Sequence, residues 1–270
     1  MYLRFRLELL INLSMISLPR QTLLFLIFFV ACQSPKSPSV KDIIKNSIAA
    51  YGLDSKEYSI DFDFRDYHYS LQRDGEYFSY SREIQQEDSK IVDIMTSNKK
   101  LQRYENDILV SLQDSVQNIY SNSLNSVMYF FQLPKPLQDQ AVNASLLQNK
   151  EIAGAHYWTL KITFDQSGGG DDFQDEFRYW INQDNYQIDY MAYNYLTDGG
   201  GTRFRKAMNK RKIKGLLFQD YINYRPKETF THLDSLPSLF LQGELKELSL
   251  IENNNIVLKR GIVKHKTSFY

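Results

Sequence analysis

The sequence predicts an α+β protein whose main element is a large, curved antiparallel sheet. Apolar and polar residues alternate over many consecutive segments, which is typical of half-buried strands. Helical periodicity appears in only three places, and most strand-like segments follow one another with no helix between them, unlike a repeated βαβ series. Because a sheet of about ten strands must twist and curl, we expect an open half-barrel with two or three helices on its concave side.

The first half of the domain begins with a helix and continues with strands. Ile43, Ile44, Ile48 and Tyr51 recur at three- to four-residue spacing after Asp42, which predicts a helix. From residue 58 the period changes to two, and an Asp-Gly pair at 74–75 predicts a tight hairpin turn. The strands expected in this half cover residues 58–64, 67–72, 77–81, 91–96, 100–104 and 108–112.

A long helix is predicted over residues 114–131, because its apolar residues form a broad stripe and Pro134 and Pro136 follow it. A second series of strands comes next. These strands are expected at residues 157–164, 176–182, 187–196, 202–208 and 216–224. A last helix over about 233–242 and a strand over 245–251 complete the predicted domain.

The N-terminus carries the most specific signal in the chain. A largely apolar run of ten residues, 22–31, follows Arg20 and leads directly into Cys32, the only cysteine. At about 1.5 Å per residue this run spans only half of a roughly 30 Å hydrocarbon core, so it indicates a signal peptide and not a membrane-spanning helix. A cysteine directly after a small residue resembles the lipobox of bacterial lipoproteins, in which the cysteine is acylated and becomes the new N-terminus.

We therefore expect four segments. Residues 1–31 form a signal peptide, with Met15 as an alternative start, and residues 32–41 hold the lipidated Cys32 and a flexible tether rich in proline and serine. Residues 42–253 form one domain, and 254–270 form a basic tail. The expected location is the cell envelope, attached through Cys32 to the outer membrane, because Gln33 follows the cysteine as in outer-membrane lipoproteins.

The charge balance argues against a nucleic-acid-binding protein. Residues 1–31 hold three of the 32 basic and one of the 32 acidic residues, so the mature chain has 29 basic and 31 acidic residues and a net charge near −2. Proteins that bind nucleic acids usually carry a clear basic excess. A single cysteine also excludes an intramolecular disulfide bond, and the sequence predicts neither a cofactor nor an oligomeric state.

The residue types that usually carry catalysis show no recognisable spacing. His68, His156, His232 and His265 match no zinc motif, and no Gly-x-Ser-x-Gly nucleophile motif is present. The sequence therefore predicts no catalytic residue and no metal site. One weaker alternative is a calcium site, because carboxylates are the ligands that hard cations favour. Its candidate ligands are Asp165, Asp171, Asp172 and Asp175.

The aromatic face of the sheet is the strongest indication of a binding function. The aromatic residues expected to point inward either pack as core against the helices or line a hydrophobic groove for an acyl chain or another apolar ligand. They are Phe62, Phe64, Tyr69, Trp158, Phe164, Tyr179, Tyr190 and Phe218.

Two glycine triplets, 168–170 and 199–201, are also unusual. Neither is followed by a helical pattern or a Lys-Ser/Thr pair, which a phosphate-binding loop requires. They are therefore interpreted as flexible hairpin ends or as part of a polar rim of a binding groove. Asp198, Arg203 and Arg205 would supply the charged groups of this rim.

Several motifs resemble a family of uncharacterised Bacteroidota-type lipoproteins that carries only a domain-of-unknown-function label. They lie within residues 42–253, at 63–69, 120–134, 164–170, 195–205, 220–224 and 245–249. No site residues follow from this resemblance. More loosely, the layout is similar to the half-barrel of periplasmic lipoprotein carriers and outer-membrane lipoprotein receptors, which implies an antiparallel sheet that binds acyl chains.

Three functions remain open from the sequence. The first is a lipid-anchored envelope protein that binds an apolar ligand, which requires a continuous apolar cavity under the helices. The second is a non-catalytic envelope scaffold or interaction module, favoured by exposed edge strands or surface patches. The third is an envelope hydrolase or lyase, which requires polar groups that converge in one cleft, such as Asp66, His68, Asp198 and Arg203.

Overall fold

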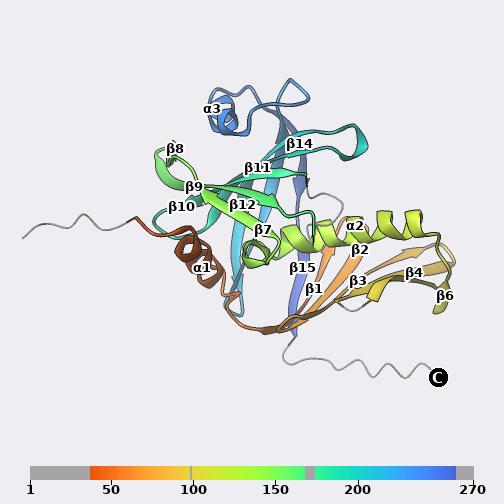
Figure 1. Ribbon diagram of the computed structural model, residues 1–270. Helices are drawn as coiled ribbons and strands as arrows, with labels where there is room; N and C mark the ends of the chain where they lie inside the picture. The colour runs from red at the N-terminus through yellow and green to blue at the C-terminus, as the bar shows by residue number, and fades with distance from the viewer. Residues whose placement is uncertain (1–36, 98, 168–173, 260–270) are drawn as a thin grey trace, which may run out of the picture. The chain divides into compact units, whose positions relative to one another are not determined.

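A computed structural model of the protein describes residues 37–97, 99–167 and 174–259, with the side chains of Lys99 and Asp198 left out. The folded unit begins at Pro38. Every strand pair is antiparallel, and each sheet is open in the described part of the chain (Figure 1). The predicted α+β class is therefore confirmed, with the difference that the strands divide between two sheets.

The first sheet contains seven strands in the order β15-β1-β2-β3-β4-β5-β6. Short turns join β1 to β6 in sequence, so each strand pairs with the next one along the chain. The strands are β1 (Glu57–Phe64), β2 (Tyr67–Asp74), β3 (Tyr77–Gln86), β4 (Ser89–Thr96), β5 (Lys99–Glu105), β6 (Ile108–Val110) and β15 (Asn254–Lys259).

The second sheet has the order β14-β13-β12-β11-β10-β9-β7, and the short β8 also pairs with β9. Its strands are β7 (Val142–Leu146), β8 (Lys150–Ile152), β9 (Ala155–Phe164), β10 (Glu176–Asn182), β11 (Ile188–Tyr195), β12 (Gly201–Ile213), β13 (Leu216–Arg225) and β14 (Lys246–Ile251). The described residues of this part of the chain also form three 3-10 helices: η1 (Lys135–Gln138) before β7, η2 (Thr197–Gly199) between β11 and β12, and η3 (Leu233–Ser235) after β13.

The predicted end of the domain is corrected by β15. Residues 254–259 were expected in a basic tail, but they pair with β1, where Ile60 lies opposite Leu258. Ile256 and Leu258 pack against the core, and Lys259 forms an ion pair of 2.5 Å with Asp61. The strand has only three apolar residues, and asparagines and basic residues flank them, so the sequence analysis assigned the segment to a basic tail. Residues 260–270 lie outside the described part of the chain.

Helix α1 (Val40–Ala50) begins two residues earlier than predicted, because Ser39 caps it. The Ser39 side chain accepts a hydrogen bond from the Asp42 amide, and the Asp42 carboxylate accepts one from the Ser39 amide, which is a capping box. Ile43, Ile44 and Ile48 bury the inner face of the helix. The tether is therefore shorter than the expected 32–41.

Helix α2 (Asp114–Phe131) contacts both sheets. Near its N-terminal half, Gln117 donates to the Leu101 carbonyl of β5 at 2.6 Å, and Ser123 accepts from Arg82 of β3 at 2.8 Å. At its C-terminal end, the Phe130 ring lies 5.6 Å from the Tyr193 ring of the second sheet, centroid to centroid. Figure 1 shows this helix running across the strands of the first sheet.

The two faces of the second sheet belong to different clusters of buried residues. One face joins the main core, where it packs with α1, α2 and the first sheet. The opposite face carries Trp180, Tyr190 and Phe204, which pack with the short helix α3 (Leu236–Leu241). Consecutive residues such as Tyr179 and Trp180 fall in different clusters, because side chains alternate across a strand.

The described residues include no helix that is long and apolar enough to span a membrane.

A buried charge cluster between the first sheet and α2 provides a test of this packing. Asp93, only 1% exposed, accepts hydrogen bonds from Arg82 and from Arg103 at 2.7–2.9 Å. Asp93→Ala leaves these guanidinium groups without their carboxylate. We expect it to lower the free energy of unfolding by roughly 3–5 kcal/mol, measured by urea denaturation.

The control for this test is Glu83→Ala, which removes a surface ion pair with Lys90 in the same sheet. It should change the free energy of unfolding by less than about 1 kcal/mol. Equal losses in the two variants would show that Asp93 does not hold α2 on the sheet.

Candidate functional site

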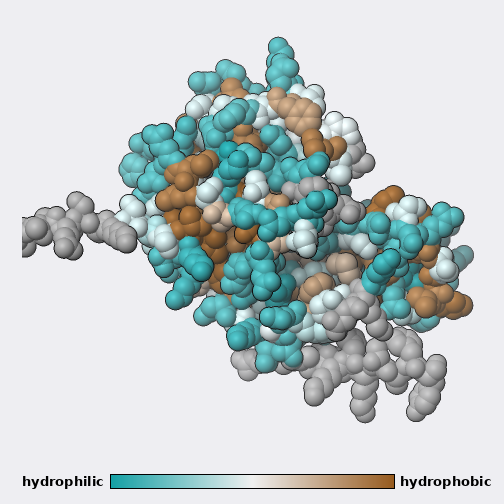
Figure 2. All heavy atoms as spheres, viewed as in Figure 1, coloured by the Kyte–Doolittle hydropathy of each residue, from teal (hydrophilic) through white to brown (hydrophobic). Residues whose placement is uncertain are grey.

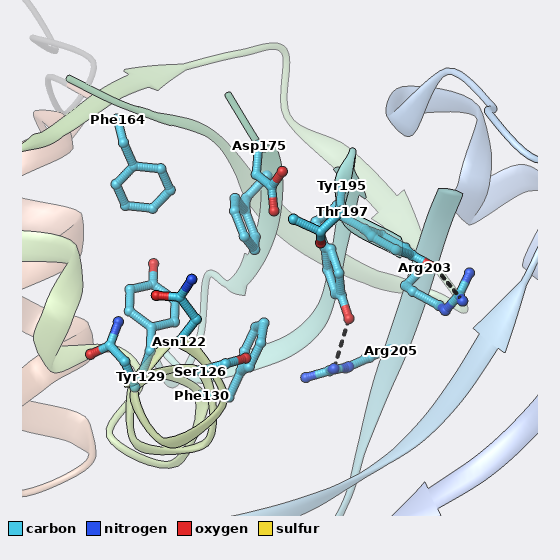
Figure 3. Close-up of a pocket in the computed structure, with 13 residues that line it drawn as sticks. Asn122, Ser126, Tyr129, Phe130, Phe164, Asp175, Tyr195, Thr197, Arg203 and Arg205 are labelled. Atoms are coloured by element: carbon cyan, nitrogen blue, oxygen red, sulfur yellow. Dashed lines mark hydrogen bonds between the residues drawn. The ribbon is translucent and has the colours of Figure 1, made fainter. Parts of the chain in front are cut away.

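A cavity of about 380 Å³ opens between the C-terminal half of α2 and the second sheet, and we call it the α2 pocket. Figure 3 shows side chains from α2 facing side chains from β9 to β12 across it. Its lining residues are Asn122, Asn125, Ser126, Tyr129, Phe130, Phe164, Asp175, Phe177, Tyr193, Tyr195, Thr197, Arg203 and Arg205. The volume lies at the small end of the range of about 300–1,000 Å³ that is usual for ligand pockets.

Six aromatic rings form the apolar wall of the α2 pocket. Tyr129 and Phe130 come from α2, and the other four come from β9, β10 and β11. The Phe177 ring lies 5.7 Å from the Phe164 ring and 5.2 Å from the Tyr193 ring, centroid to centroid. Residues at every second position of a strand share a face, so Tyr193 and Tyr195 point to the same side.

The helical side of the pocket also carries short polar side chains. Asn122, Asn125 and Ser126 are spaced three and four residues apart, which places them on one face of α2. Tyr129 continues the same face one turn later. The pocket therefore has an aromatic wall and a polar edge.

Two arginines of β12 supply the positive charge of the pocket. Arg203 and Arg205 are two residues apart and share the face that looks toward α2. Arg203 donates to the Tyr195 hydroxyl at 2.5 Å and Arg205 to the Tyr193 hydroxyl at 2.7 Å. The Arg205 guanidinium also lies 4.2 Å from the centre of the Phe130 ring, a cation–π contact. Figure 3 shows Arg205 pointing toward Phe130.

The pocket carries more positive than negative charge. Among its lining residues two arginines stand against one carboxylate, Asp175, which gives a net charge near +1. Asp175 is itself buried and has an interaction partner. An anionic group is therefore the charge that the pocket favours.

Burial raises the pKa values of two tyrosines at the pocket, Tyr129 in its wall and Tyr179 next to it. Burial raises the pKa of Tyr129 above its ordinary value, although its hydrogen bond with Tyr179 acts in the opposite direction. Burial also raises the pKa of Tyr179, well above that of an exposed tyrosine. The two hydroxyl oxygens are 3.3 Å apart. Both phenols are therefore neutral at pH 7 and act as hydrogen-bonding groups.

The predicted groove residues are largely core residues. Phe62, Tyr69, Trp158, Tyr179 and Phe218 are buried in the main core, while Phe64 and Phe164 are partly buried against it. Of the eight predicted residues, Phe164 lines the α2 pocket and Phe218 lines a void of only about 10 Å³.

The helices fill most of the interior that was expected to be a continuous groove. The Phe131 ring of α2 stacks on Phe62 with centroids 3.7 Å apart and an interplanar angle of 5°. Phe131 also lies 5.6 Å from the Phe218 ring. These rings therefore fill the part of the interior between Phe62 and Phe218 that was expected to be open.

Tyr190 is a correction to the predicted inward set. It pairs with Trp180 and belongs to the cluster under α3, on the opposite face from Tyr179. The register of β10 and β11 shifts between Trp180 and Ile181. Because such a bulge changes which residues share a face, alternation counted along the sequence assigns Tyr190 to the wrong side.

Two of the three residues predicted for the polar rim lie in the α2 pocket. Arg203 and Arg205 line the same pocket. Asp198 lies in η2, and its side chain is outside the described part of the structure. The first glycine triplet and two candidate calcium ligands, Asp171 and Asp172, also lie outside it. Among the described residues no group of three or more His, Cys, Asp or Glu side chains could hold a metal ion.

The residues proposed for an enzyme do not meet in one pocket of the described structure. Asp66 and His68 line a second, more open cavity at the β1–β2 turn, whereas Arg203 lines the α2 pocket. His68 contacts Asp63 at 2.6 Å, and both side chains are more than one-third exposed. The hydroxyl of Ser70, the serine nearest in sequence, donates to Asp61, so these residues form no Ser-His-Asp arrangement.

Most pocket residues were missed by the sequence analysis, although two signals could have found them. The alternation Tyr193-Asn-Tyr195 ends four residues before Gly199 of the second glycine triplet, and Tyr193 pairs with Arg203 in the next strand. In α2, Asn122, Asn125 and Ser126 share a helix face with Tyr129. Neither signal shows that the helix and β11 lie opposite each other.

A separate apolar patch lies at the far end of the first sheet. Ile108 and Leu109 of the edge strand β6 are 71% and 56% exposed, and Ile119 of α2 is 64% exposed. Figure 2 shows hydrophobic surface at this end of the molecule. The patch is distinct from the α2 pocket, because the two share no residue.

Two comparisons concern the sequence. The sequence model described as "Family of unknown function (DUF6503)" matches residues 20–253, which is most of the chain. A comparison with curated proteins gives no match.

Solved structures of three bacterial proteins are similar to this chain at low identity. A LolA superfamily protein from Nitrosomonas europaea has 14% identity and a TM-score of 0.44, over 84% of this chain and 96% of the other. A DUF1329 family protein from Desulfovibrio piger has 11% identity and a TM-score of 0.41, over 84% and 95%. A putative outer membrane lipoprotein-sorting protein domain from Vibrio parahaemolyticus has 8% identity and a TM-score of 0.42, over 82% and 93%.

The buried tyrosines beside the pocket predict a loss of stability at high pH. Tyr129 and Tyr179 have raised pKa values in the folded state, whereas in the unfolded state they ionise near pH 10. Above about pH 10 the unfolded state therefore releases protons that the folded state keeps, and the free energy of unfolding falls. We expect Tyr129→Phe/Tyr179→Phe to show a smaller fall between pH 9 and pH 11, measured by urea denaturation.

Tyr77→Phe is the matched control, because Tyr77 is 44% exposed. This variant should keep the pH dependence of the unmodified protein. If the double variant and the control lose stability equally, burial of these two phenols does not govern the alkaline transition.

Proposed function

We propose that this protein, which belongs to the family of unknown function DUF6503, is a lipid-anchored protein of the cell envelope that binds an apolar ligand in the α2 pocket. The observation that carries the proposal is a ligand-sized cavity of about 380 Å³ lined by six aromatic side chains. The Bacteroidota type of the family and attachment to the outer membrane remain predictions from the sequence.

The lining of the pocket supports an apolar ligand. Removing apolar surface from water contributes about 25 cal/mol per Å², and the rings of Tyr129, Phe130, Phe164 and Phe177 offer such surface on both sides of the cavity. The α2 side is supported by Phe131, which directly follows Phe130 and stacks on Phe62. The pocket is therefore built into packed elements of the fold.

The anchoring part of the proposal rests on the N-terminal sequence. Cys32 follows the apolar run 22–31, and the capped start of α1 at Val40 leaves only a short connection between the two. One acyl chain binds a membrane only marginally, and stable attachment takes more than one. An acylated Cys32 would hold the α2 pocket close to the membrane surface, where apolar ligands are concentrated.

An interaction module is the second candidate function, and one observation favours it. The edge strand β6 and the neighbouring part of α2 expose Ile108, Leu109 and Ile119, and an exposed apolar edge strand is a typical site of contact with other chains. The ligand-binding proposal ranks first because the α2 pocket has a defined volume and lining.

A search for a bound ligand tests the proposed function. A soluble form without residues 1–32 retains the whole folded unit. Native mass spectrometry followed by organic extraction should show a co-purifying apolar molecule, and the emptied protein should take up a fluorescent fatty acid. Ser126→Trp places a large ring in the pocket, and we expect it to reduce uptake by about tenfold or more, a loss of about 1.4 kcal/mol.

Ser115→Trp provides the matched control for Ser126→Trp. It makes the same change at an exposed position in the first turn of α2, outside the pocket. Normal uptake by Ser115→Trp and weak uptake by Ser126→Trp would support the proposal. An empty protein that takes up no fatty acid would contradict it and leave the interaction module as the leading function.

Anchoring predicts a separate outcome for Cys32. In bacteria labelled with a palmitate analogue, the full-length protein should carry the label and sediment with membranes. Cys32→Ser should lose the label and the membrane association, because it removes the only thiol. Ser34→Ala, two residues away, should behave like the unmodified protein. Labelling of Cys32→Ser at the normal level would exclude this cysteine as the acylation site.

A further inference from the structure

We propose that the ligand of the α2 pocket is an amphiphile whose anionic head group, a carboxylate or a phosphate, binds Arg205. This inference rests on the proposed function and adds the chemical class of the ligand. It starts from Arg205, which is buried in the pocket wall and has no carboxylate partner among the described residues.

Arg205 differs from the other buried arginines of the described structure. Arg82 and Arg178 are 5% and 4% exposed, and each has an aspartate oxygen within 3.0 Å. Arg205 is 9% exposed and forms no ion pair with a carboxylate within 4.0 Å in the described part of the chain. A buried arginine is almost always paired, because an uncompensated buried charge is strongly destabilising.

The hydrogen-bonding groups of Arg205 are mostly unused. Its terminal nitrogen donates to the Tyr193 hydroxyl at 2.7 Å, but its Nε is buried and has no hydrogen-bond partner in the described structure. A guanidinium offers five N–H donors in a planar fork that matches a carboxylate or a phosphate. The cation–π contacts with Phe130 and Tyr193 leave these in-plane donors available.

Neighbouring groups extend the site. A tyrosine hydroxyl that accepts a hydrogen bond still has its own proton to donate. Tyr193 and Tyr195 each accept from an arginine, so both can donate to an anion. Arg203 lies two residues from Arg205 on the same face of β12 and supplies a second positive charge at the edge of the pocket.

The same cavity therefore holds two different environments next to each other. Phe164 and Phe177 offer apolar contact, and Arg205 with Tyr193 offers charge and donors. A purely apolar ligand would leave Arg205 buried and unpaired, and a small inorganic anion would leave the aromatic wall without contact. An amphiphile with one anionic head satisfies both.

Ligands that share one alkyl chain test this inference. Binding of dodecanoate, dodecyl phosphate and dodecanol to the soluble form without residues 1–32 is measured by displacement of a fluorescent fatty acid. We expect at least one of the two anions to bind roughly ten- to hundredfold more tightly than the alcohol, as for a charge-assisted hydrogen-bond pair. The stronger of the two anions identifies the head group as a carboxylate or a phosphate.

Variants of the protein then test whether the preference for anionic ligands depends on Arg205. Arg205→Met should reduce the ratio of anion to alcohol affinity to near one while the alcohol still binds. Lys206→Met is the matched control, because it removes a charge from the same strand on the opposite face, beside Phe240, and it should keep the full ratio. If Arg205→Met does not fold, Arg203→Met, at a partly exposed position, should lower the ratio at least severalfold.

The outcomes separate this inference from the proposed function. Equal binding of the alcohol and both anions by the unmodified protein would overturn the anionic head group and leave an apolar pocket. An anion preference that survives Arg205→Met unchanged would also overturn the assignment. Failure of all three ligands to bind would contradict the proposed function itself.

Discussion

The position of helix α2 is the constraint on which the rest of the structure depends. Its first turns and its middle are fixed to the first sheet: Gln117 donates to the Leu101 carbonyl, and Ser123 accepts from Arg82 of the buried Arg82–Asp93–Arg103 cluster. Its C-terminal half ends in three consecutive aromatic residues, Tyr129 to Phe131, which meet both sheets. Because the helix is held at both ends, the side chains between them face the second sheet at a fixed distance and leave the α2 pocket open.

The buried arginines of the described structure are of two kinds. Arg82 and Arg178 are paired with Asp93 and Asp234, and these pairs hold structural elements together, the first under α2 and the second between β10 and η3. Arg205 is buried to a similar degree, but among the described residues its hydrogen-bond partner is the neutral phenol of Tyr193. The arginines of the first kind have their carboxylate partners within the folded chain. Arg205 instead lines a cavity. This difference in pairing, more than burial, distinguishes a binding residue from a structural one here.

The two sheets are connected where β14 ends and β15 begins. The buried carboxylate of Asp220 in β13 accepts a hydrogen bond from the Asn253 amide at 3.0 Å and from Arg211 of β12 at 3.0 Å. This fixes the turn from which β15 leaves the second sheet and pairs with β1. The chain that was expected to be a tail therefore completes the first sheet and covers the edge of β1, which would otherwise expose unpaired backbone groups.

The sequence alone determined the class of the fold, because local patterns carry it: period-two alternation, three helical stripes and the hairpin turn at Gly75 depend only on neighbouring residues. It also placed Arg203 and Arg205 together, since two residues apart on a strand share a face. The division into two sheets, the bulge that moves Tyr190 to the opposite face, and the meeting of Tyr129 with Phe177 were decided by tertiary structure. These depend on pairing and packing between separate segments of the chain, which no local period records.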